Sequence, residues 1–326
     1  MSNGAWWSGK IDVGSPGYTR VNVLLDTGST DVWLVSASCS KNCGTAPKYI
    51  APAGVQSEGT LNLTYHDDSH VFGKVYRDTI RVGDLQVENV AVGAADIVHD
   101  MKDIEGIFGL AFPAISTFKA DPYSQKKGQT YVSFYDTMLQ QGLVHGKFSF
   151  SYTGDVGEFY LDGWNQEISD GNFTWLDLDL AEDEAPGLWK IKADAIKLDD
   201  SDVLLEQRMI VDTGTNYMLG PMNAVEQFYQ CVKGAKPLNN GFWQIPCDTP
   251  DVAFTFDGKD FVITGSVFVK CAPGGYQLDE GYCVGMFKGD PGLSFWILGQ
   301  FAMQNWYTTF DYKDQRVGFS SLKTTT

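Results

Sequence analysis

The sequence predicts a mostly β protein built from two similar lobes. Short β-branched or aromatic runs alternate with turn residues along the chain, and glycine is abundant at 35 of 326 residues. Helical periodicity is clear in only two stretches, at 130–143 and 221–234. The segment VLLDTGST at 23–30 recurs as MIVDTGTN at 209–216, which indicates an internal repeat.

The predicted elements follow from local patterns. In the first helical stretch Val132, Tyr135 and Met138 lie on one side, and in the second Pro221 stands near the start and Gly234 at the stop. Apolar alternation around glycine turns predicts two hairpins, GKFSFSYTGDVGEFYLDG at 146–163 and DVAFTFDGKDFVITG at 251–265.

Each copy of the repeat is followed by a triplet of two apolar residues and glycine. The triplets are Ile107-Phe108-Gly109 and Ile297-Leu298-Gly299. The first lies 83 residues beyond Asp26 (109 − 26) and the second 87 residues beyond Asp212 (299 − 212). Matching order and spacing predict two related domains, 1–165 and 166–326, with the boundary in the region 160–185.

Composition excludes several classes of partner. The formal net charge of −17, with 41 Asp and Glu against 24 Lys and Arg and no basic patch, disfavours nucleic acid and anionic membranes. No apolar run approaches the roughly 18–20 residues of a membrane helix. Self-repulsion falls as the carboxylates protonate, which suits an acidic compartment.

The six cysteines favour disulfides over zinc. No two cysteines stand two residues apart as in zinc motifs, and the four histidines do not cluster with them along the sequence. No metal and no cofactor are therefore expected. Two sequons, at Asn62 and Asn172, favour a secreted glycoprotein, although such triplets also arise by chance.

The two Asp-Thr-Gly turns point to catalysis. Asp26 and Asp212 each follow an apolar run, where an unused carboxylate costs several kcal/mol in desolvation. If the lobes are related by a pseudo-twofold axis, the two carboxylates meet. At about 3 Å and an effective dielectric of about 20 they repel by about 5 kcal/mol, so the pair holds one proton. Such a pair can activate a water on a carbonyl. A single turn of this kind would be interpreted as structural.

Together with the repeat, further motifs identify a family. The chain resembles pepsin-like aspartic proteases over nearly its whole length, with a flap of the microbial type. The resemblance implies a bilobal pepsin-like fold of two β-barrel-like lobes with a catalytic cleft between them, and an acid-active endopeptidase. The motifs are VLLDTGSTDVWLV (23–35), LTYHDDS (63–69), IEGIFGLAFPAIS (104–116), GLWKI (187–191), MIVDTGTNYMLGP (209–221) and FWILGQFAMQNWYTTFDYKDQRVGF (295–319).

The resemblance assigns roles within the two turns. Asp26 and Asp212 are the catalytic pair. Thr27 and Thr213 would lock the turns together, and Ser29 and Thr215 would hydrogen-bond the outer carboxylate oxygens. Gly28 and Gly214 complete the two turns, where glycine permits close backbone approach.

It also assigns a flap and substrate pockets. Tyr65 corresponds to the tyrosine of the flap hairpin, and Trp33 to the tryptophan whose indole N–H binds that tyrosine. The alternative for these two is ordinary strand aromatics. The pocket before the scissile bond would be lined by Leu24 and Ile107 and the pocket after it by Leu188; buried core is the alternative for all three.

The chain departs from the family pattern in its flap, where Tyr-Gly-x-Gly-Ser is replaced by Tyr65-His66-Asp67-Asp68-Ser69. The loss of both glycines predicts an altered flap geometry, in which His66 contacts substrate. Asp67 matches microbial members and implies cleavage after lysine as well as after large apolar residues. Asn216 stands where Ser or Thr contacts the substrate backbone.

For the cysteines, the resemblance implies the pairs Cys39–Cys43 and Cys247–Cys283. Cys231 and Cys271 are left over and would then pair with each other.

The expected partners are polypeptide substrates and pepstatin-type inhibitors. One chain supplies both aspartates, so a monomer is expected, in a secreted or a vacuolar, lysosome-like location. Two other classes remain open: a catalytically silent binding or inhibitor protein with this fold, and a carbohydrate-active enzyme with paired carboxylates.

Overall fold

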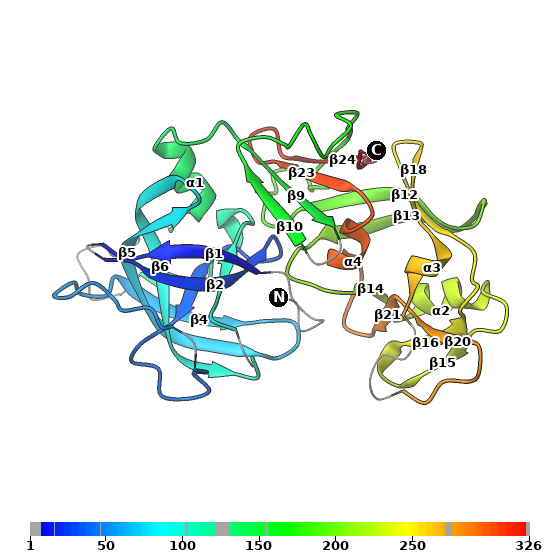
Figure 1. Ribbon diagram of the computed structural model, residues 1–326, viewed down its shortest axis with the longest axis horizontal. Helices are drawn as coiled ribbons and strands as arrows, with labels where there is room; N and C mark the ends of the chain where they lie inside the picture. The colour runs from blue at the N-terminus through cyan, green and yellow to red at the C-terminus, as the bar shows by residue number, and fades with distance from the viewer. Residues whose placement is uncertain are drawn as a thin grey trace. The chain divides into compact units, whose positions relative to one another are not determined.

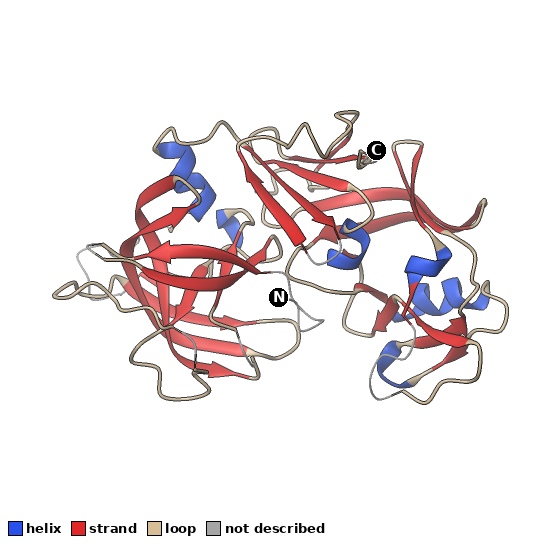
Figure 2. Cartoon of the chain, in the orientation of Figure 1, coloured by secondary structure: helices blue, strands red, loops and turns tan. Residues whose placement is uncertain are grey.

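The chain contains two compact units, one formed by Ser2–His145 with Ala185–Leu188 and the other mainly by Gly146–Glu184 with Trp189–Thr326. We call them the N-terminal and the C-terminal unit. Strands dominate both (Figures 1 and 2). The predicted domain division after residue 165 stays a prediction. This computed structural model describes residues 8–15, 17–45, 47–101, 104–120, 131–153, 156–270 and 276–323.

The N-terminal unit is built on one eight-stranded sheet in the order β1-β2-β7-β3-β6-β5-β4-β8. β1 pairs with β5 as well as with β2, so six of the strands close into a barrel. A short helix and a 3₁₀ turn accompany the sheet. The elements are β1 (Ser8–Val13), β2 (Thr19–Asp26), β3 (Val32–Val35), β4 (Gly59–Thr64), β5 (His70–Val82), β6 (Leu85–His99), β7 (Gly106–Gly109), η1 (Pro113–Ile115), β8 (Lys119–Ala120) and α1 (Phe134–Gln140).

The described residues of the C-terminal unit form three sheets, in the orders β10-β9-β23-β24-β11, β18-β17-β12-β13-β22-β14-β21 and β15-β16-β20-β19. The strands of the first two sheets are β9 (Lys147–Thr153), β10 (Val156–Leu161), β11 (Thr174–Asp177), β12 (Lys190–Leu198), β13 (Ser201–Val211), β14 (Met218–Pro221), β17 (Val252–Phe256), β18 (Lys259–Ile263), β21 (Phe287–Asp290), β22 (Trp296–Leu298), β23 (Tyr307–Asp311) and β24 (Arg316–Ser320). The remaining elements are α2 (Met222–Gln230), β15 (Lys236–Pro237), η2 (Asn239–Gly241), β16 (Trp243–Pro246), α3 (Gly265–Phe268), β19 (Val269–Lys270), β20 (Tyr282–Gly285) and α4 (Gln300–Met303).

The sequence repeat appears as the same strand arrangement in both units. The first triplet forms β7, which lies parallel to β2 and antiparallel to β3. The second triplet lies at the end of β22 and just beyond it, and β22 is parallel to β13 and antiparallel to β14. A Cβ on Gly109 would collide with the backbone of Thr30, and one on Gly299 with the backbones of Thr215 and Tyr217. The triplet glycines are therefore required by close packing against the Asp-Thr-Gly loops.

The predicted hairpins and helices are confirmed with shorter helical bounds. β9 pairs with β10 and β17 with β18, both antiparallel. α1 begins after Ser133, whose hydroxyl accepts the Asp136 N–H, and so covers less than the predicted stretch. α2 begins after Pro221 and buries Val225, Phe228 and Tyr229.

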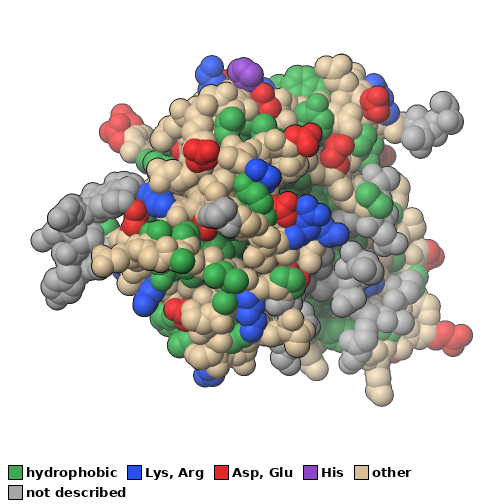
Figure 3. Space-filling view, turned by 60° about the vertical axis from the view of Figure 1, so that its left-hand side comes forward, with side chains coloured by type: hydrophobic (Ala, Val, Ile, Leu, Met, Phe, Trp, Pro, Cys, Tyr) green, Lys and Arg blue, Asp and Glu red, His purple; other side chains and the backbone are tan. Residues whose placement is uncertain are grey.

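The core of the N-terminal unit lies inside its barrel. β4 shows the reason in its strict alternation of buried and exposed positions, which places every second side chain inward. The cluster comprises Leu24, Trp33, Val35, Leu61, Leu63, Val71, Val75, Ala91, Ala95, Val98, Ile107, Phe118 and Tyr131. On the face drawn in Figure 3, acidic and basic side chains are interspersed with small apolar areas. Within the described residues, no helix is long and apolar enough to span a membrane.

Candidate active site

The first Asp-Thr-Gly turn follows the end of β2 and holds Asp26 almost completely buried, at 5% exposure. The Gly28 N–H donates to Asp26 Oδ1 at 2.8 Å, and the Ser29 hydroxyl donates to Oδ2. The Asp26 carbonyl accepts the Leu110 N–H at 2.8 Å, which ties the turn to the residue after the first triplet. Donors on both carboxylate oxygens stabilise the ionised form against the cost of burial.

The second turn repeats this geometry after β13. Asp212 is 9% exposed, and its Oδ1 accepts the Gly214 N–H at 2.7 Å. Its Oδ2 accepts the Thr215 hydroxyl at 2.7 Å. Each aspartate thus receives the amide two residues later and the hydroxyl three residues later. Each unit, considered separately, therefore places the aspartate of its Asp-Thr-Gly turn as a buried carboxylate with one oxygen held by a backbone amide and the other by a hydroxyl.

Both turn threonines are fully buried. Thr27 and Thr213 have 0% exposure, and the Thr213 carbonyl accepts a hydrogen bond from the Gln300 side-chain amide. Gln300 also anchors the second turn through its backbone N–H, which donates to the Thr215 carbonyl at 2.7 Å. The expected lock between the two threonines stays a prediction, because each unit is described by itself.

The hairpin β4–β5 carries the predicted flap. Its turn spans Tyr65 to Ser69, with the Tyr65 N–H donating to the Ser69 carbonyl at 2.8 Å and the Asp68 N–H to the Tyr65 carbonyl at 3.1 Å. Asp68 adopts a left-handed conformation at φ 64°. Aspartate tolerates this region better than most residues, so the turn closes without the glycines usual in the family.

Tyr65 connects this flap to the first turn. The Trp33 indole N–H donates to the Tyr65 hydroxyl at 2.7 Å. Burial, and secondarily the charge of Asp26, raise the pKa of Tyr65 well above its ordinary value, while hydrogen bonds from Trp33 and Ser29 act in the opposite direction. Tyr65 therefore stays a neutral phenol near the Asp26 carboxylate.

The other flap residues lie in the turn. Asp67 Oδ1 accepts two hydrogen bonds from Ser69, one from its backbone N–H at 3.1 Å and one from its hydroxyl at 2.5 Å. His66, Asp67 and Asp68 are exposed.

The predicted pocket residues of the N-terminal unit lie side by side. Leu24 and Ile107 face each other in the register of β2 and β7, and both belong to the buried core. Leu188 is half-buried and belongs to the N-terminal unit although it follows most of that unit in sequence. The adjacent Gly187 carbonyl accepts the Phe112 N–H at 3.1 Å, which fixes this segment. Asn216 is half-buried in the C-terminal unit, where its carbonyl accepts the Phe301 N–H at 3.0 Å.

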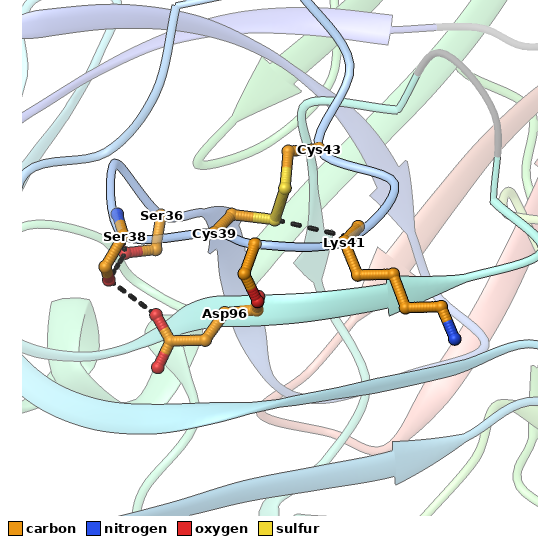
Figure 4. The surroundings of a disulfide bond; sticks show 7 residues. Ser36, Ser38, Cys39, Lys41, Cys43 and Asp96 are labelled. Atoms are coloured by element: carbon orange, nitrogen blue, oxygen red, sulfur yellow. Dashed lines mark hydrogen bonds between the residues drawn. A yellow bond between two sulfur atoms is a disulfide. The ribbon is translucent and has the colours of Figure 1, made fainter.

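Among the described residues two disulfides are present, Cys39–Cys43 in the N-terminal unit (Figure 4) and Cys247–Cys283 in the C-terminal unit. Both are pairs that the family resemblance implies. Cys231 is exposed, and the predicted bond Cys231–Cys271 involves a residue outside the described ranges. Within those ranges no group of three or more His, Cys, Asp or Glu is placed to bind a metal ion.

Sequence reasoning missed Asp31, a buried acid five residues after Asp26. Its carboxylate accepts the Ser116 hydroxyl at 2.6 Å and both the amide and hydroxyl of Thr117 at 2.7 Å. Burial raises the pKa of Asp31 despite these donors. The signal was present in the sequence, since Asp31 immediately precedes the apolar run of β3.

The chain is similar to known proteins over nearly its whole length. Residues 7–322 match the family model described as eukaryotic aspartyl protease. Cathepsin D from Gallus gallus is 30% identical, over 97% of this chain and 80% of its own. Aspergillopepsin-1 from Aspergillus flavus is 29% identical, over 94% and 74%. Penicillopepsin-2 from Penicillium janthinellum is 30% identical, over 93% and 76%.

A match over nearly the whole chain, with two Asp-Thr-Gly turns of the same hydrogen-bond pattern, leaves one assignment. This chain belongs to the eukaryotic aspartyl protease family and is a pepsin-like aspartic endopeptidase that acts on polypeptides.

Proposed function

We propose that Asp26 and Asp212 form the catalytic pair of an acid-active endopeptidase. The observation that carries the proposal is the shared pattern of donors, with Gly28 and Ser29 on one carboxylate and Gly214 and Thr215 on the other. Equivalent surroundings suit two carboxylates that share one proton, because neither position alone is specialised to be the acid.

The reaction follows from one shared proton. The ionised carboxylate accepts a proton from a bound water, while the protonated carboxyl donates a hydrogen bond to the carbonyl oxygen of the scissile peptide. Water oxygen bonds to the carbonyl carbon and gives a tetrahedral diol. Forming the diol transfers the proton of the protonated carboxyl to the former carbonyl oxygen, while the other carboxyl holds the proton from water. The C–N bond then breaks as that carboxyl gives its proton to the leaving nitrogen. One diol hydroxyl gives its proton to the other carboxylate as the new carbonyl forms, so the two carboxyls again hold one proton.

Both units would supply features for substrate selection. Tyr65, held by Trp33, would close over the peptide, and Leu24 with Ile107 would favour a large apolar side chain before the scissile bond. Leu188 would contact the residue after that bond and Asn216 the substrate backbone. His66 and Asp67 stand exposed on the flap turn, and the Asp67 carboxylate would pair with a lysine side chain before the scissile bond.

The remaining expectations extend this proposal. Thr27 and Thr213 would hold the two turns together. The protein would be a pepstatin-sensitive monomer in a secreted or vacuolar, lysosome-like acidic setting, with N-glycans at the exposed Asn62 and Asn172. Two disulfides support a route through an oxidising compartment.

The test is cleavage of acid-denatured globin between pH 2.5 and 6.5, with and without pepstatin. Asp26→Asn and Asp212→Asn should each abolish cleavage, whereas Asp84→Asn, in the exposed turn between β5 and β6, should retain it. Cleavage that persists in either active-site variant would reject the proposed pair. A folded wild-type protein that cleaves nothing would indicate the silent binding protein instead.

Selection by Asp67 is tested separately, with peptides that carry lysine or norleucine before the scissile bond. Asp67→Asn removes the charge but keeps an oxygen for Ser69, and it should lower kcat/KM for the lysine peptide about tenfold without changing the norleucine peptide. Asp68→Asn is the matched control on the same turn. Equal losses on both peptides would exclude a role in selecting lysine.

A further inference from the structure

Three of the four histidines of the chain, His66, His70 and His99, lie in the flap turn or at its base. His70 begins β5 immediately after the flap turn, and His99 ends β6 directly opposite it in the register of the two strands. Lys41, His70 and His99 form a group that we call the flap-root cluster. The catalytic proposal uses none of its members.

The two imidazole rings of the cluster are in face contact. Their centroids lie 4.2 Å apart with planes inclined by 30°. His70 also reaches the flap itself, because its Nδ1 lies 3.2 Å from the carbonyl oxygen of Asp68. The stack therefore connects the end of β6 to the turn that carries Tyr65.

Lys41 joins the stack from the disulfide loop. It lies between Cys39 and Cys43, and its side chain is directed away from the sulfur atoms (Figure 4). The loop is docked on β6 through the Val98 N–H, which donates to the Lys41 carbonyl at 3.2 Å. Lys41 Nζ lies 3.2 Å from His99 Nε2. A disulfide-closed loop thus holds one end of the cluster in place.

This contact favours the neutral form of His99. An ammonium group has only protons to donate, so a hydrogen bond from Lys41 to Nε2 needs the lone pair that the neutral ring presents there. Protonating His99 converts the hydrogen bond into a contact between two cations and adds a charge to the face of His70. Both changes oppose the stacked arrangement.

The surrounding charges do not compensate. Partial burial, followed by Lys41 and His70, lowers the pKa of His99, and only Asp100 on the following residue acts in the opposite direction. The Asp96 carboxylate on β6 accepts a hydrogen bond from the Ser38 hydroxyl at 2.6 Å, and the Asp67 carboxylate on the flap accepts one from the Ser69 hydroxyl. Phe72 packs against His70 in a T-shaped arrangement, with the two ring centroids 5.3 Å apart. Among the described residues, protonation of His99 therefore places a second positive charge beside Lys41.

We propose that His99 is a positioning residue of the flap: neutral, it fastens the flap base to the disulfide loop through Lys41 and the ring of His70, and protonated, it releases it. The inference rests on the proposed role of Tyr65 as the flap residue. Acidification would then have two effects on one protein, protonating the catalytic pair and loosening the element that admits substrate. Histidine is the side chain whose charge ordinarily changes between about pH 5 and 8, and the lowered pKa of His99 moves the release toward the acid side.

The first test measures the flap without catalysis. Amide hydrogen exchange of the peptide covering residues 60–70 is compared between wild type and His99→Gln at the same pH, so that the intrinsic exchange chemistry cancels. Glutamine keeps an uncharged acceptor for Lys41. At pH 4.5 the wild-type flap should exchange about fivefold faster than the variant, and at pH 7.5 the two should agree.

Matched variants keep this test decisive. His145→Gln alters an exposed histidine outside the cluster and should follow wild type at both pH values. Lys41→Gln removes the cation beside His99 and should move the pH midpoint of flap loosening upward, which provides a readout if His99→Gln does not fold. An unchanged pH dependence of flap exchange in His99→Gln or Lys41→Gln overturns the inference.

The second test separates positioning from chemistry. At pH 4.5 His99→Gln should raise KM about fivefold and leave kcat unchanged, because the flap of the variant stays fastened and admits substrate less readily. A change confined to kcat would also overturn the inference. A protein that cleaves no substrate would refute the proposed function, yet the exchange experiment would still decide whether the cluster responds to pH.

Discussion

Replacing Asp31 tests how the loop after the first triplet is held against the first catalytic turn. The Asp31 carboxylate accepts three hydrogen bonds, from the Ser116 hydroxyl and from the amide and hydroxyl of Thr117. Asp31→Ala strands these three donors in a region where Asp31 is only 5% exposed. At about 1 kcal/mol for each lost bond the substitution should cost about 3 kcal/mol.

Asp31→Asn should cost far less. Its oxygen can keep both bonds from Thr117, and its NH₂ group can donate to the Ser116 hydroxyl, which rotates to accept. The pH dependence separates the two side chains further. Because burial raises the pKa of Asp31 in the folded protein, the stability that this carboxyl contributes is present in acid and lost as the pH rises through that pKa. The asparagine variant should therefore gain stability relative to wild type between pH 3 and pH 7.

The assay is urea unfolding, monitored by hydrogen-exchange mass spectrometry of the peptide covering residues 106–118. A local probe is needed because a protein of two units need not unfold in one step. Two results would refute the reasoning. One is a cost below about 1 kcal/mol for Asp31→Ala, which is less than a single stranded donor predicts. The other is an asparagine variant as unstable as the alanine variant at every pH.

Three further predictions concern packing, charge and the flap. Gly109→Ala and Gly299→Ala should each destabilise their unit by at least about 2 kcal/mol in urea titrations, because the added Cβ would collide with backbone atoms. Gly83→Asn is the control and should not destabilise the protein, because Gly83 has φ 57° and open space around the position of a Cβ. Asp311→Asn should cost about 3 kcal/mol at pH 6 by breaking the pairs with Lys147 at 2.8 Å and Arg316 at 3.0 Å. Burial alone would raise the pKa of Asp311, but hydrogen bonds led by the one from Lys147 outweigh burial and lower this pKa. The stability that the Asp311 carboxylate contributes is therefore lost as the pH falls through its folded-state pKa. A stability deficit of Asp311→Asn that does not shrink at pH 2.5 would contradict the assignment. Trp33→Phe removes the donor to Tyr65 and should reduce kcat/KM about fivefold in peptide assays, with Trp175→Phe in the other unit as control; equal rates for the two variants would exclude a role of this bond.

The sequence by itself was sufficient for the family, the mostly β fold and the position of both aspartates. These are local or repeated signals: apolar runs that end in Asp-Thr-Gly, glycines spaced behind them, and alternation around turn residues. The triplets were informative because a strand packed between two others admits only glycine where it meets the loop, as Gly109 and Gly299 do.

The tertiary structure decided what no local pattern specifies. Asp68 takes a left-handed conformation at a position where the family pattern has glycine, within the turn set by the register of β4 and β5. Asp31 finds its partners 85 and 86 residues away, and His70 meets His99 only because β5 and β6 pair in one register. Contacts between residues distant in sequence depend on strand pairing and packing, and those are set by the whole fold rather than by the residues beside each side chain.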